Sequence, residues 1–321
     1  MTLNDWLDSQ DCQHELASLL QSIVSAGIQI HDLVRQGDLA GFQGASGIEN
    51  VQGEQQQKLD LIANDMLMDA LKHNVHCRAL ASEEMDHSVE ANPEGKFLVV
   101  FDPLDGSSNI DINMPVGTIF SVLPSSESTG DDALLQPGSA QCAAGYLLYG
   151  TATMLALSLG GETRLFTLDL TNHTYVTTRE SAQRIAPDTK EFAINASNQR
   201  FWEAPVQAYF NECLAGTTGV RGKNFNMRWV AAMVGDVHRI LCRGGLFAYP
   251  RDTKDPSKAG KLRLLYEANP MSLLIEGAGG RSSTGTERIL EIQPANLHQR
   301  VPVILGSRSE VDYLVAKHLA D

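Results

Sequence analysis

A short polar segment carries residue types that bind metal ions and phosphate. It directly follows an apolar run at residues 97–101 and contains Asp102, Pro103, Asp105, Gly106, Ser107 and Ser108. Pro103 favours an extended backbone at Asp102, and Gly106 allows the chain to approach an anion closely. Carboxylates and carbonyls bind Mg²⁺, whereas hydroxyls and N–H groups bind phosphate. The segment predicts a metal-phosphoester site, although the same residue types are also typical of a plain turn.

Other acids occupy comparable positions elsewhere in the chain. They are Glu83 and Glu84 after the apolar residues 78–82, Glu267 after residues 262–266, and Asp60 beside the apolar face of a helix expected at 59–70. Taken singly, each acid is more typical of a solvated surface. Together they predict that these carboxylates meet at one site and bind a hard cation such as Mg²⁺ or Mn²⁺. Such cations prefer oxygen ligands, whereas zinc prefers His and Cys.

The sequence excludes several other phosphate chemistries. It contains no C-x5-R loop of the cysteine phosphatases and no D-x-D motif of the aspartyl-phosphate enzymes. Residues 215–224 resemble a Walker A loop, but Thr217 and Asn224 replace the first Gly and the Ser/Thr of that motif. We expect this segment to be a turn-rich connection.

The first half of the chain must supply the elements that hold these acids. Apolar residues at helical spacing predict a helix at 16–28, and the Gly-rich residues 37–53 predict a mobile loop. Residues 133–161 carry no charge, but their Pro and Gly residues argue against a membrane span. We expect two buried strands there instead, at 143–149 and 151–159.

A polar stretch at residues 180–190 separates two parts of the chain. It predicts two half-domains, at 1–182 and at 183–321, and most of the candidate metal ligands lie in the first. In the second half we expect strands at 192–195, 246–249 and 262–266, and helices at 202–214, 227–241, 270–276 and 310–319. Strands and helices mixed in this order predict layers of an α/β fold.

Composition narrows the function further. The chain has 321 residues, 43% of them hydrophobic, which is enough for a sizeable core. Its formal net charge of −14 argues against nucleic-acid and membrane partners, because counterion release needs basic clusters. Five scattered cysteines and an N-terminus without an apolar signal segment predict a reduced, cytoplasmic protein.

Six segments of the chain resemble class I fructose-1,6-bisphosphatases. They are LASEE, FDPLDGSSNIDINMPVGTIFSV, AAGYLLYGTATMLAL, GGLFAYP, GKLRLLYEANPMSLLIEGAGG and HQRVPVILGS. The resemblance extends from about residue 16 to the C-terminus. It implies the layered αβαβα sugar-phosphatase fold and Mg²⁺-dependent hydrolysis of fructose 1,6-bisphosphate to fructose 6-phosphate and phosphate, in gluconeogenesis or Calvin-type carbon metabolism.

The resemblance also implies individual residue roles. The implied metal ligands are Glu83, Glu84, Asp102, the Leu104 carbonyl, Asp105 and Glu267, for two or three Mg²⁺ ions with Mn²⁺ as a substitute. Catalytic acids that close the metal site and activate water would be Glu54, Asp60 and Glu84. Substrate contacts would come from Asp105, Gly106, Ser107, Ser108, Asn195, Arg228, Met233, Tyr249, Lys261 and Arg263. The family further implies that residues 1–182 form a regulatory-type half and that residues 183–321 form the half that binds the sugar bisphosphate. It also implies a homotetramer in which Arg228 reaches a neighbouring subunit's site.

Departures from the family pattern change two expectations. Eukaryotic members bind the inhibitor AMP near the first helix, and the matching positions here are Gln13, Ala17, Lys96, Phe97 and Ser139. Because only the lysine is retained, we expect weak or absent AMP inhibition. Near the 6-phosphate, Asn198 and Trp229 replace two common tyrosines, so sedoheptulose 1,7-bisphosphate becomes a second possible substrate.

Three alternatives to this function stay open at this point. One is a broader inositol-type or nucleotide phosphatase, which would not need Lys261 and Tyr249. Another is a catalytically inactive phosphosugar sensor, which should have lost at least one metal carboxylate. The last is an acidic structural protein, which would have no reason to place acids at strand ends.

Overall fold

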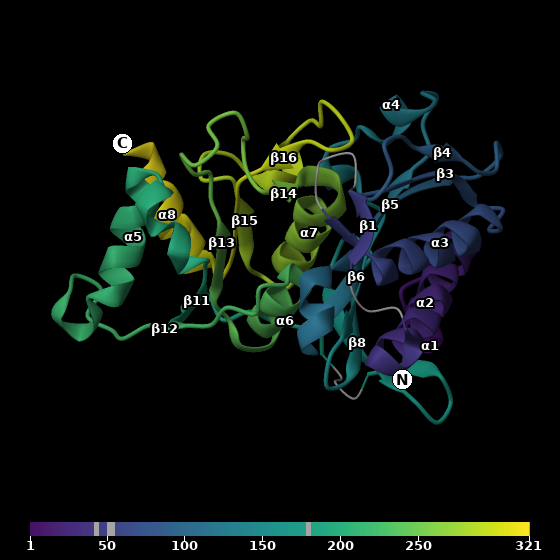
Figure 1. The fold of residues 1–321 in the computed structure, drawn as a ribbon, viewed down its shortest axis with the longest axis horizontal. Coiled ribbons are helices and arrows are strands. Elements are labelled where there is room, and N and C mark those ends of the chain that lie inside the picture. Colours follow the sequence, from purple (N-terminus) through teal and green to yellow (C-terminus); the bar gives the residue numbers. More distant parts are fainter. Residues whose placement is uncertain (42–44, 50–54, 178–180, 321) are drawn as a thin grey trace.

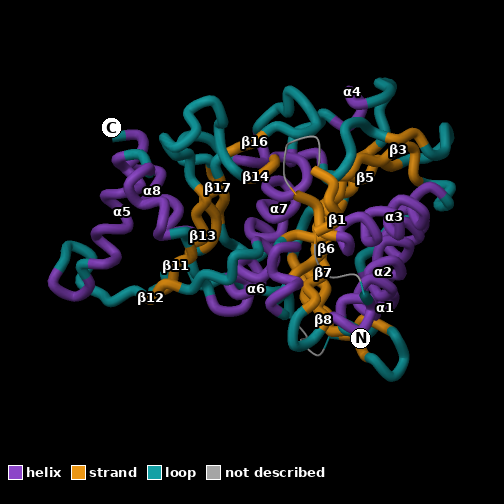
Figure 2. The backbone as a smooth tube through the Cα atoms, viewed as in Figure 1, coloured by secondary structure: helices purple, strands orange, loops and turns teal. Residues whose placement is uncertain are grey.

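The computed structural model describes residues 1–41, 45–49, 55–177 and 181–320. Helices and sheets alternate in five layers across the molecule, from α5 and α8 at the left of Figure 1 to the N-terminal helices at the right. This arrangement confirms the layered αβαβα fold. Figure 2 shows the two sheets as separate groups of strands with α6 and α7 between them.

The first sheet has eight strands in the order β10-β9-β8-β7-β6-β5-β3-β4. They are β3 (Cys77–Ser82), β4 (Val89–Glu90), β5 (Phe97–Asp105), β6 (Val116–Pro124), β7 (Ala143–Tyr149), β8 (Thr153–Ser158), β9 (Thr163–Asp169) and β10 (Thr174–Val176). The outer helix layer on it consists of α1 (Leu3–Ser9), α2 (His14–Val34) and α3 (Lys58–Lys72). These helices bury Leu20, Leu67 and other apolar residues against β5 and β7, because each helix carries one apolar face.

The second sheet has five strands in the order β12-β11-β13-β17-β15. They are β11 (Glu191–Ala193), β12 (Asn226–Met227), β13 (Leu246–Tyr249), β15 (Arg281–Ser283) and β17 (Val303–Gly306). The helices of this half are α5 (Ala204–Leu214), α6 (Met233–Arg243), α7 (Asn269–Gly277) and α8 (Arg308–Leu319). Smaller elements are the helix α4 (Asp131–Leu134) and two pairs of short strands, β1 (Ala45–Glu49) with β2 (Gln55–Gln57) and β14 (Leu262–Arg263) with β16 (Arg300–Val301).

The central core joins the two halves of the chain. Tyr146 of β7 and Val237 of α6 belong to the same buried cluster, which fills the space between the two sheets around α6 and α7. The division near residue 182 stays a prediction, and residues 178–180 lie outside the described residues. Among the residues that the structure describes, no helix is both long and apolar enough to span a membrane.

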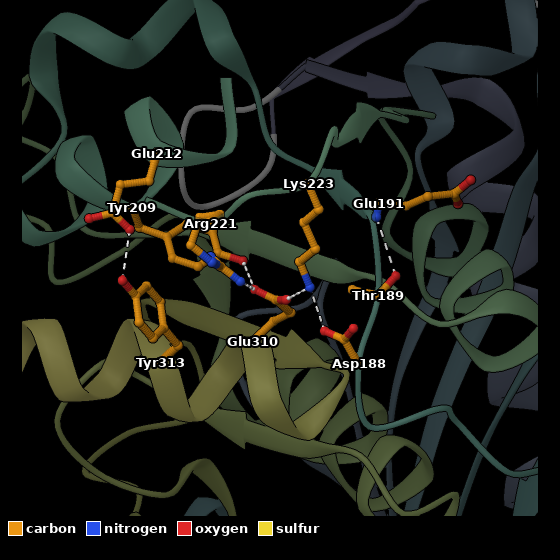
Figure 3. A network of polar contacts seen from close by, with 9 residues as sticks. All are labelled: Asp188, Thr189, Glu191, Tyr209, Glu212, Arg221, Lys223, Glu310 and Tyr313. Carbon is orange, nitrogen blue, oxygen red and sulfur yellow. Dashed lines mark hydrogen bonds and ion pairs between the residues drawn. The ribbon is translucent and has the colours of Figure 1, made fainter. Parts of the chain in front are cut away.

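A buried carboxylate fastens α8 to the loop after α5. Glu310 accepts hydrogen bonds from Tyr209 (2.7 Å), Arg221 (2.6 Å) and Lys223 (3.0 Å), and Lys223 also pairs with Asp188 (Figure 3). These two cations belong to the segment that resembles a Walker A loop. The segment is a turn-rich connection, as expected: it contains the short 3-10 helix Gly216–Thr218, and the N–H of Gly222 donates to the Gly219 carbonyl at 3.1 Å. Its lysine is engaged by carboxylates of this chain.

Three predicted elements differ from the structure. The segment 37–53, expected to be a loop, contains a 3-10 helix at Gly37–Ala40 and the strand β1. The other two differences concern where an element begins or ends. The helix expected at 227–241 begins only at Met233, because residues 226–227 form β12 and Ala231 has a left-handed φ of 65°. The strand expected at 262–266 ends at Arg263 and continues as a π-helix, η6 (Leu264–Ala268). Residues 227–241 and 262–266 are mostly apolar in sequence, so periodicity alone could not separate strand from helix.

Candidate active site

Parallel pairing of β3 and β5 brings the first two acidic segments together. Within the first sheet, β3 and β5 are the described neighbours that run parallel, whereas the other described pairs are antiparallel. Their carboxyl ends therefore meet at one edge of the sheet. The N–H of Glu83, just after β3, donates to the carbonyl of Phe101 in β5 at 3.0 Å. Glu83 thus lies beside Asp102.

A β-bulge in β5 brings Asp102 and Asp105 to the same side. Asp102 pairs with Ile119 of β6, and Asp105 pairs with Gly117, so β5 has one extra residue in this interval. In a regular strand, residues three apart would point to opposite faces. The buried hydroxyl of Thr118 donates to the Pro103 carbonyl at 2.8 Å and supports the bulge. Up to Asp105, the segment that would also have suited a plain turn is therefore the irregular end of a strand.

The segment after the bulge docks on the N-terminus of α6. The Asp105 carboxylate accepts the N–H of Val234 at 2.7 Å, which satisfies a free donor in the first turn of that helix. Gly106 has a φ of 76°, and a Cβ there would lie 2.4 Å from the Cβ of Ala232. Both its conformation and its surroundings therefore require glycine.

The third carboxylate comes from the π-helix η6. Glu267 is buried, and its carboxylate accepts the N–H of Arg263 at 2.6 Å. The Arg263 side chain in turn forms a buried ion pair with Glu83. Single π-turns occur frequently at functional sites. In this chain the π-turn allows Glu267 to face the sheet edge that carries Asp102 and Asp105.

Asp102, Asp105 and Glu267 form a cluster that fits a divalent metal ion. One oxygen from each carboxylate lies within 4.8 Å of the other two, and all three side chains are buried. Burial and the neighbouring acids raise the pKa of Asp102 well above its usual value, that of Asp105 to about 7 and that of Glu267 to about 8. A divalent cation would offset this crowding of like charges, and an all-oxygen donor set suits a hard cation.

Asp60 and Glu84 lie next to this cluster. Asp60, in the first turn of α3, accepts the N–H of Gln57 at 2.7 Å, and its second oxygen is buried without a hydrogen-bond partner in the described structure. Burial is the main cause that raises the pKa of Asp60 to about 7; the hydrogen bond from Gln57 opposes this rise, and the nearby Glu84 adds to it by repulsion. Glu84 is half-buried. Glu54, the third predicted catalytic acid, lies outside the described residues.

A cavity of about 560 Å³ opens beside the cluster. It is lined by Asp105, Gly106, Ser107, Ser108, Asn195, Trp229, Ala231, Tyr249, Lys261, Leu262, Arg263 and Glu267. Most of the predicted substrate contacts therefore meet in one place, although they come from both halves of the chain. Two do not line the cavity: Met233 is buried at the start of α6, and Arg228 is exposed next to β12.

A second cavity of about 400 Å³ shares Tyr249 and Lys261 with the first. Asn198, Lys254 and Lys258 contribute to its wall. Trp229, in the wall of the first cavity, stacks on Phe247 with ring centroids 5.9 Å apart and an interplanar angle of 9°. The space beside Tyr249 thus continues beyond the main cavity.

Comparisons with known proteins agree with this geometry. The family model "Fructose-1-6-bisphosphatase, N-terminal domain" matches residues 1–180, and "Fructose-1-6-bisphosphatase, C-terminal domain" matches residues 185–318. The chain belongs to this family.

Named relatives extend the match to nearly the whole length. A class 1 fructose-1,6-bisphosphatase of Acinetobacter baumannii (strain AYE) is 57% identical over 321 residues, covering 99% of both chains. One from Shewanella amazonensis is 58% identical over 318 residues, again covering 99% of both. The crystal structure of Leishmania major fructose-1,6-bisphosphatase in holo form shares 33% identity with a TM-score of 0.92, covering 99% of this chain and 98% of that chain. A divalent metal cofactor is a property of this family, in agreement with the carboxylate cluster.

Some residues at the site were not assigned a role from the sequence. Ala231 and Leu262 line the cavity, and buried Asp236 accepts the N–H of Val230 at 3.2 Å and so fixes the approach to α6. An aspartate in the first turn of a helix is an ordinary capping signal. The sequence around Asp236 gives no sign that the first turn of α6 also donates a hydrogen bond to Asp105.

Proposed function

We propose that this chain hydrolyses D-fructose 1,6-bisphosphate to D-fructose 6-phosphate and inorganic phosphate with divalent metal ions at the carboxylate cluster. One observation carries the proposal: a single cavity is lined by two of the clustered carboxylates, Asp105 and Glu267, and by the cations Lys261 and Arg263. Acids that suit a metal ion thus adjoin cations that suit phosphate.

The ligands for two or three Mg²⁺ ions would be Glu83, Glu84, Asp102, the Leu104 carbonyl, Asp105 and Glu267. Bound ions would supply charge neutralisation of the reacting phosphate and a water molecule of lowered pKa. Asp60 and Glu84 would accept the proton of the attacking water, which the raised pKa of Asp60 favours near neutral pH.

The remaining residues bind and orient the substrate. The N–H groups and hydroxyls of Gly106, Ser107 and Ser108 would hold the 1-phosphate beside the cluster. Asn195, Tyr249 and Lys261 would contact the sugar and its 6-phosphate, and Arg263 would offset charge near the reacting group. Met233 supports this wall from its buried position at the start of α6 rather than from the cavity surface.

Phosphate release from a panel of sugar bisphosphates, inositol phosphates and nucleotides, with Mg²⁺ and with EDTA, tests the activity. We expect Mg²⁺-dependent release from fructose 1,6-bisphosphate, and at least about a hundredfold lower kcat in Asp60→Asn, Glu84→Gln and Asp105→Ala. Asp65→Asn, an exposed acid on the same helix as Asp60, is the matched control and should retain activity. Near-full activity of Glu84→Gln or Asp105→Ala would contradict the assigned site.

The second cavity favours sedoheptulose 1,7-bisphosphate as an additional substrate. It continues the main cavity past Tyr249 and Lys261, and Asn198 leaves part of its wall without an aromatic ring. We expect Asn198→Tyr to lower kcat/KM for the seven-carbon sugar about tenfold more than for the six-carbon sugar. Equal losses for both sugars would argue against this role of the second cavity.

We also propose a homotetramer in which Arg228 acts across a subunit interface, and a cytoplasmic location. The Arg228 side chain is exposed and does not line the cavity of its own chain. Its backbone N–H donates to the carbonyl of Phe192 in β11 and so holds Arg228 beside that strand. In the described structure no disulfide joins any of the five cysteines, which suits a reducing compartment. Light scattering measures the assembly. Co-expression of Arg228→Ala with Asp105→Ala should restore part of the activity that each variant lacks, which a same-chain role of Arg228 would not allow.

A further inference from the structure

Two separate segments supply the carboxylates of the metal centre. Glu83 and Glu84 follow β3, whereas Glu267 belongs to the π-helix η6. Their relative position decides whether the carboxylates can act on the same ions. A third segment, residues 297–301, touches both and contains no residue assigned to the site so far.

We propose that His298 is a positioning residue that fixes the turn carrying Glu83 and Glu84 relative to Glu267, and so sets the affinity for the divalent metal. The role rests on the proposed function of the cluster. The imidazole Nε2 of His298 lies 2.9 Å from the carbonyl oxygen of Met85, the residue directly after Glu84. A carbonyl only accepts, so Nε2 carries the proton and donates it.

The imidazole is held from the side of η6. Its ring packs on Tyr266, the residue before Glu267, with ring centroids 5.4 Å apart and an interplanar angle of 38°. The neighbouring Leu297 is buried in a cluster with Leu265 and Tyr266. Because packing fixes the orientation of the imidazole ring, its hydrogen bond can fix the position of the Met85 carbonyl.

Backbone contacts make the same segment part of the η6 unit. The N–H of Leu264 donates to the Gln299 carbonyl at 2.8 Å, and β16 pairs with β14 directly before the π-helix. His298 therefore moves with Glu267 and contacts the turn of Glu83 and Glu84. A second connection between these units is the ion pair of Arg263 with Glu83, which involves a carboxylate itself. The histidine acts on the backbone instead and leaves both acids available to a cation.

The pair His298→Asn and His298→Gln tests this role. The Gln amide nitrogen reaches the place of Nε2, whereas the Asn amide nitrogen reaches only that of Nδ1. Mn²⁺ binding to the full chain without substrate, measured by calorimetry and electron paramagnetic resonance, is the first readout. We expect about tenfold weaker Mn²⁺ binding for the Asn variant and near-parental binding for the Gln variant.

Kinetics at varied metal concentration give a second readout. At saturating Mn²⁺ the Asn variant should recover near-parental kcat and an unchanged KM for fructose 1,6-bisphosphate, because His298 does not touch the substrate. His73→Asn, at the exposed end of α3, is the control and should change neither readout.

The outcomes separate this role from the proposed function. Parental Mn²⁺ affinity in the Asn variant, or equally weak binding in both variants, would overturn the role of His298. A parent chain that binds no Mn²⁺ would overturn the metal centre itself and the positioning role with it. Weaker binding in the Asn variant alone, with thermal unfolding in EDTA unchanged, supports the proposal.

Discussion

Gly106 links the phosphate-binding segment to the second half of the chain. Its left-handed φ of 76° and the 2.4 Å that would separate a Cβ from Ala232 leave no room for a side chain. Because Asp105 simultaneously receives the N–H of Val234, any displacement here would also move a carboxylate of the cluster. Local backbone geometry and metal geometry therefore depend on one residue.

Gly106→Ala should lower both stability and activity. We expect a loss of at least about 2 kcal/mol in the free energy of unfolding from the strained φ and the contact with Ala232, and a kcat reduced more than about tenfold. Urea unfolding and phosphate release measure these effects. Gly161→Ala, where no described atom lies within 4 Å of an added Cβ, should be near neutral. Similar losses in both variants would contradict a special role of Gly106.

At the scale of elements, the N-terminus of α6 is held by two aspartates from different segments. Asp105 accepts its Val234 N–H, and Asp236 accepts the N–H of Val230 at the entrance to the helix. Asp236 is fully buried, and burial raises its pKa to about 7 despite that hydrogen bond. The side chain thus fixes the segment between Trp229 and α6, and its burial favours the protonated form of the carboxyl group.

Asp236 should make the fold less stable as pH rises. The folded protein retains a proton that the unfolded chain has already released, so stability from this group is present below about pH 4 and lost as pH rises through about 7. In EDTA, Asp236→Asn should reduce the pH-dependent loss in the free energy of unfolding by up to about 4 kcal/mol, as measured by urea unfolding. Asp65→Asn should leave the pH dependence as in the parent. Parallel pH profiles for parent and Asp236→Asn would refute the prediction.

The Glu310 network of Figure 3 connects α8, α5 and the loop before β12. Glu310 is 1% exposed, and it neutralises Arg221 and Lys223, which are themselves 11% and 19% exposed. The guanidinium of Arg221 also lies 4.4 Å from the ring centroid of Tyr313. The network therefore fixes the loop that continues into Arg228 and Trp229.

Glu310→Gln should destabilise the protein by about 3 kcal/mol, because it leaves the largely buried Arg221 without its carboxylate partner and Lys223 with Asp188 alone. Glu212→Gln is the matched control: Glu212 pairs with Lys317 between the same two helices but is 22% exposed, so its loss should be about 1 kcal/mol or less. Urea unfolding measures both variants. Equal losses would show that burial does not set the strength of these pairs.

At the scale of the whole molecule, the surface that matches the AMP site of eukaryotic relatives is already engaged. Lys96 is the retained residue at that surface, and it pairs with Glu15 in the first turn of α2. An acid there occupies the helix end that would otherwise favour an anion. The other matched positions, Gln13, Ala17, Phe97 and Ser139, offer no cation to a phosphate.

AMP should therefore inhibit the enzyme weakly or not at all. At about 1 mM AMP, with substrate near KM, we expect most of the activity to remain, because only one of the matched positions, Lys96, carries a cation that could offset the nucleotide phosphate. Lys96→Ala should show the same response as the parent in this assay. Strong AMP inhibition that Lys96→Ala abolishes would refute this expectation.

The sequence by itself determined the residue types of the site and most of the elements that carry them. Carboxylates after apolar runs, followed by Gly106 and two serines, are local patterns, and the helices α2 and α3 have a clear apolar face. These features depend on neighbours along the chain, which a sequence displays directly. The resemblance to one family then assigned the substrate and the layered fold.

Only the tertiary structure decided how these residues meet. The β-bulge that turns Asp102 and Asp105 to one side, the π-helix that presents Glu267 and the contact of His298 with Met85 all depend on partners far away in sequence. Backbone irregularities of this kind are set by packing and by distant hydrogen bonds rather than by propensity. The acids were therefore predictable from the sequence, whereas the geometry of their site was not.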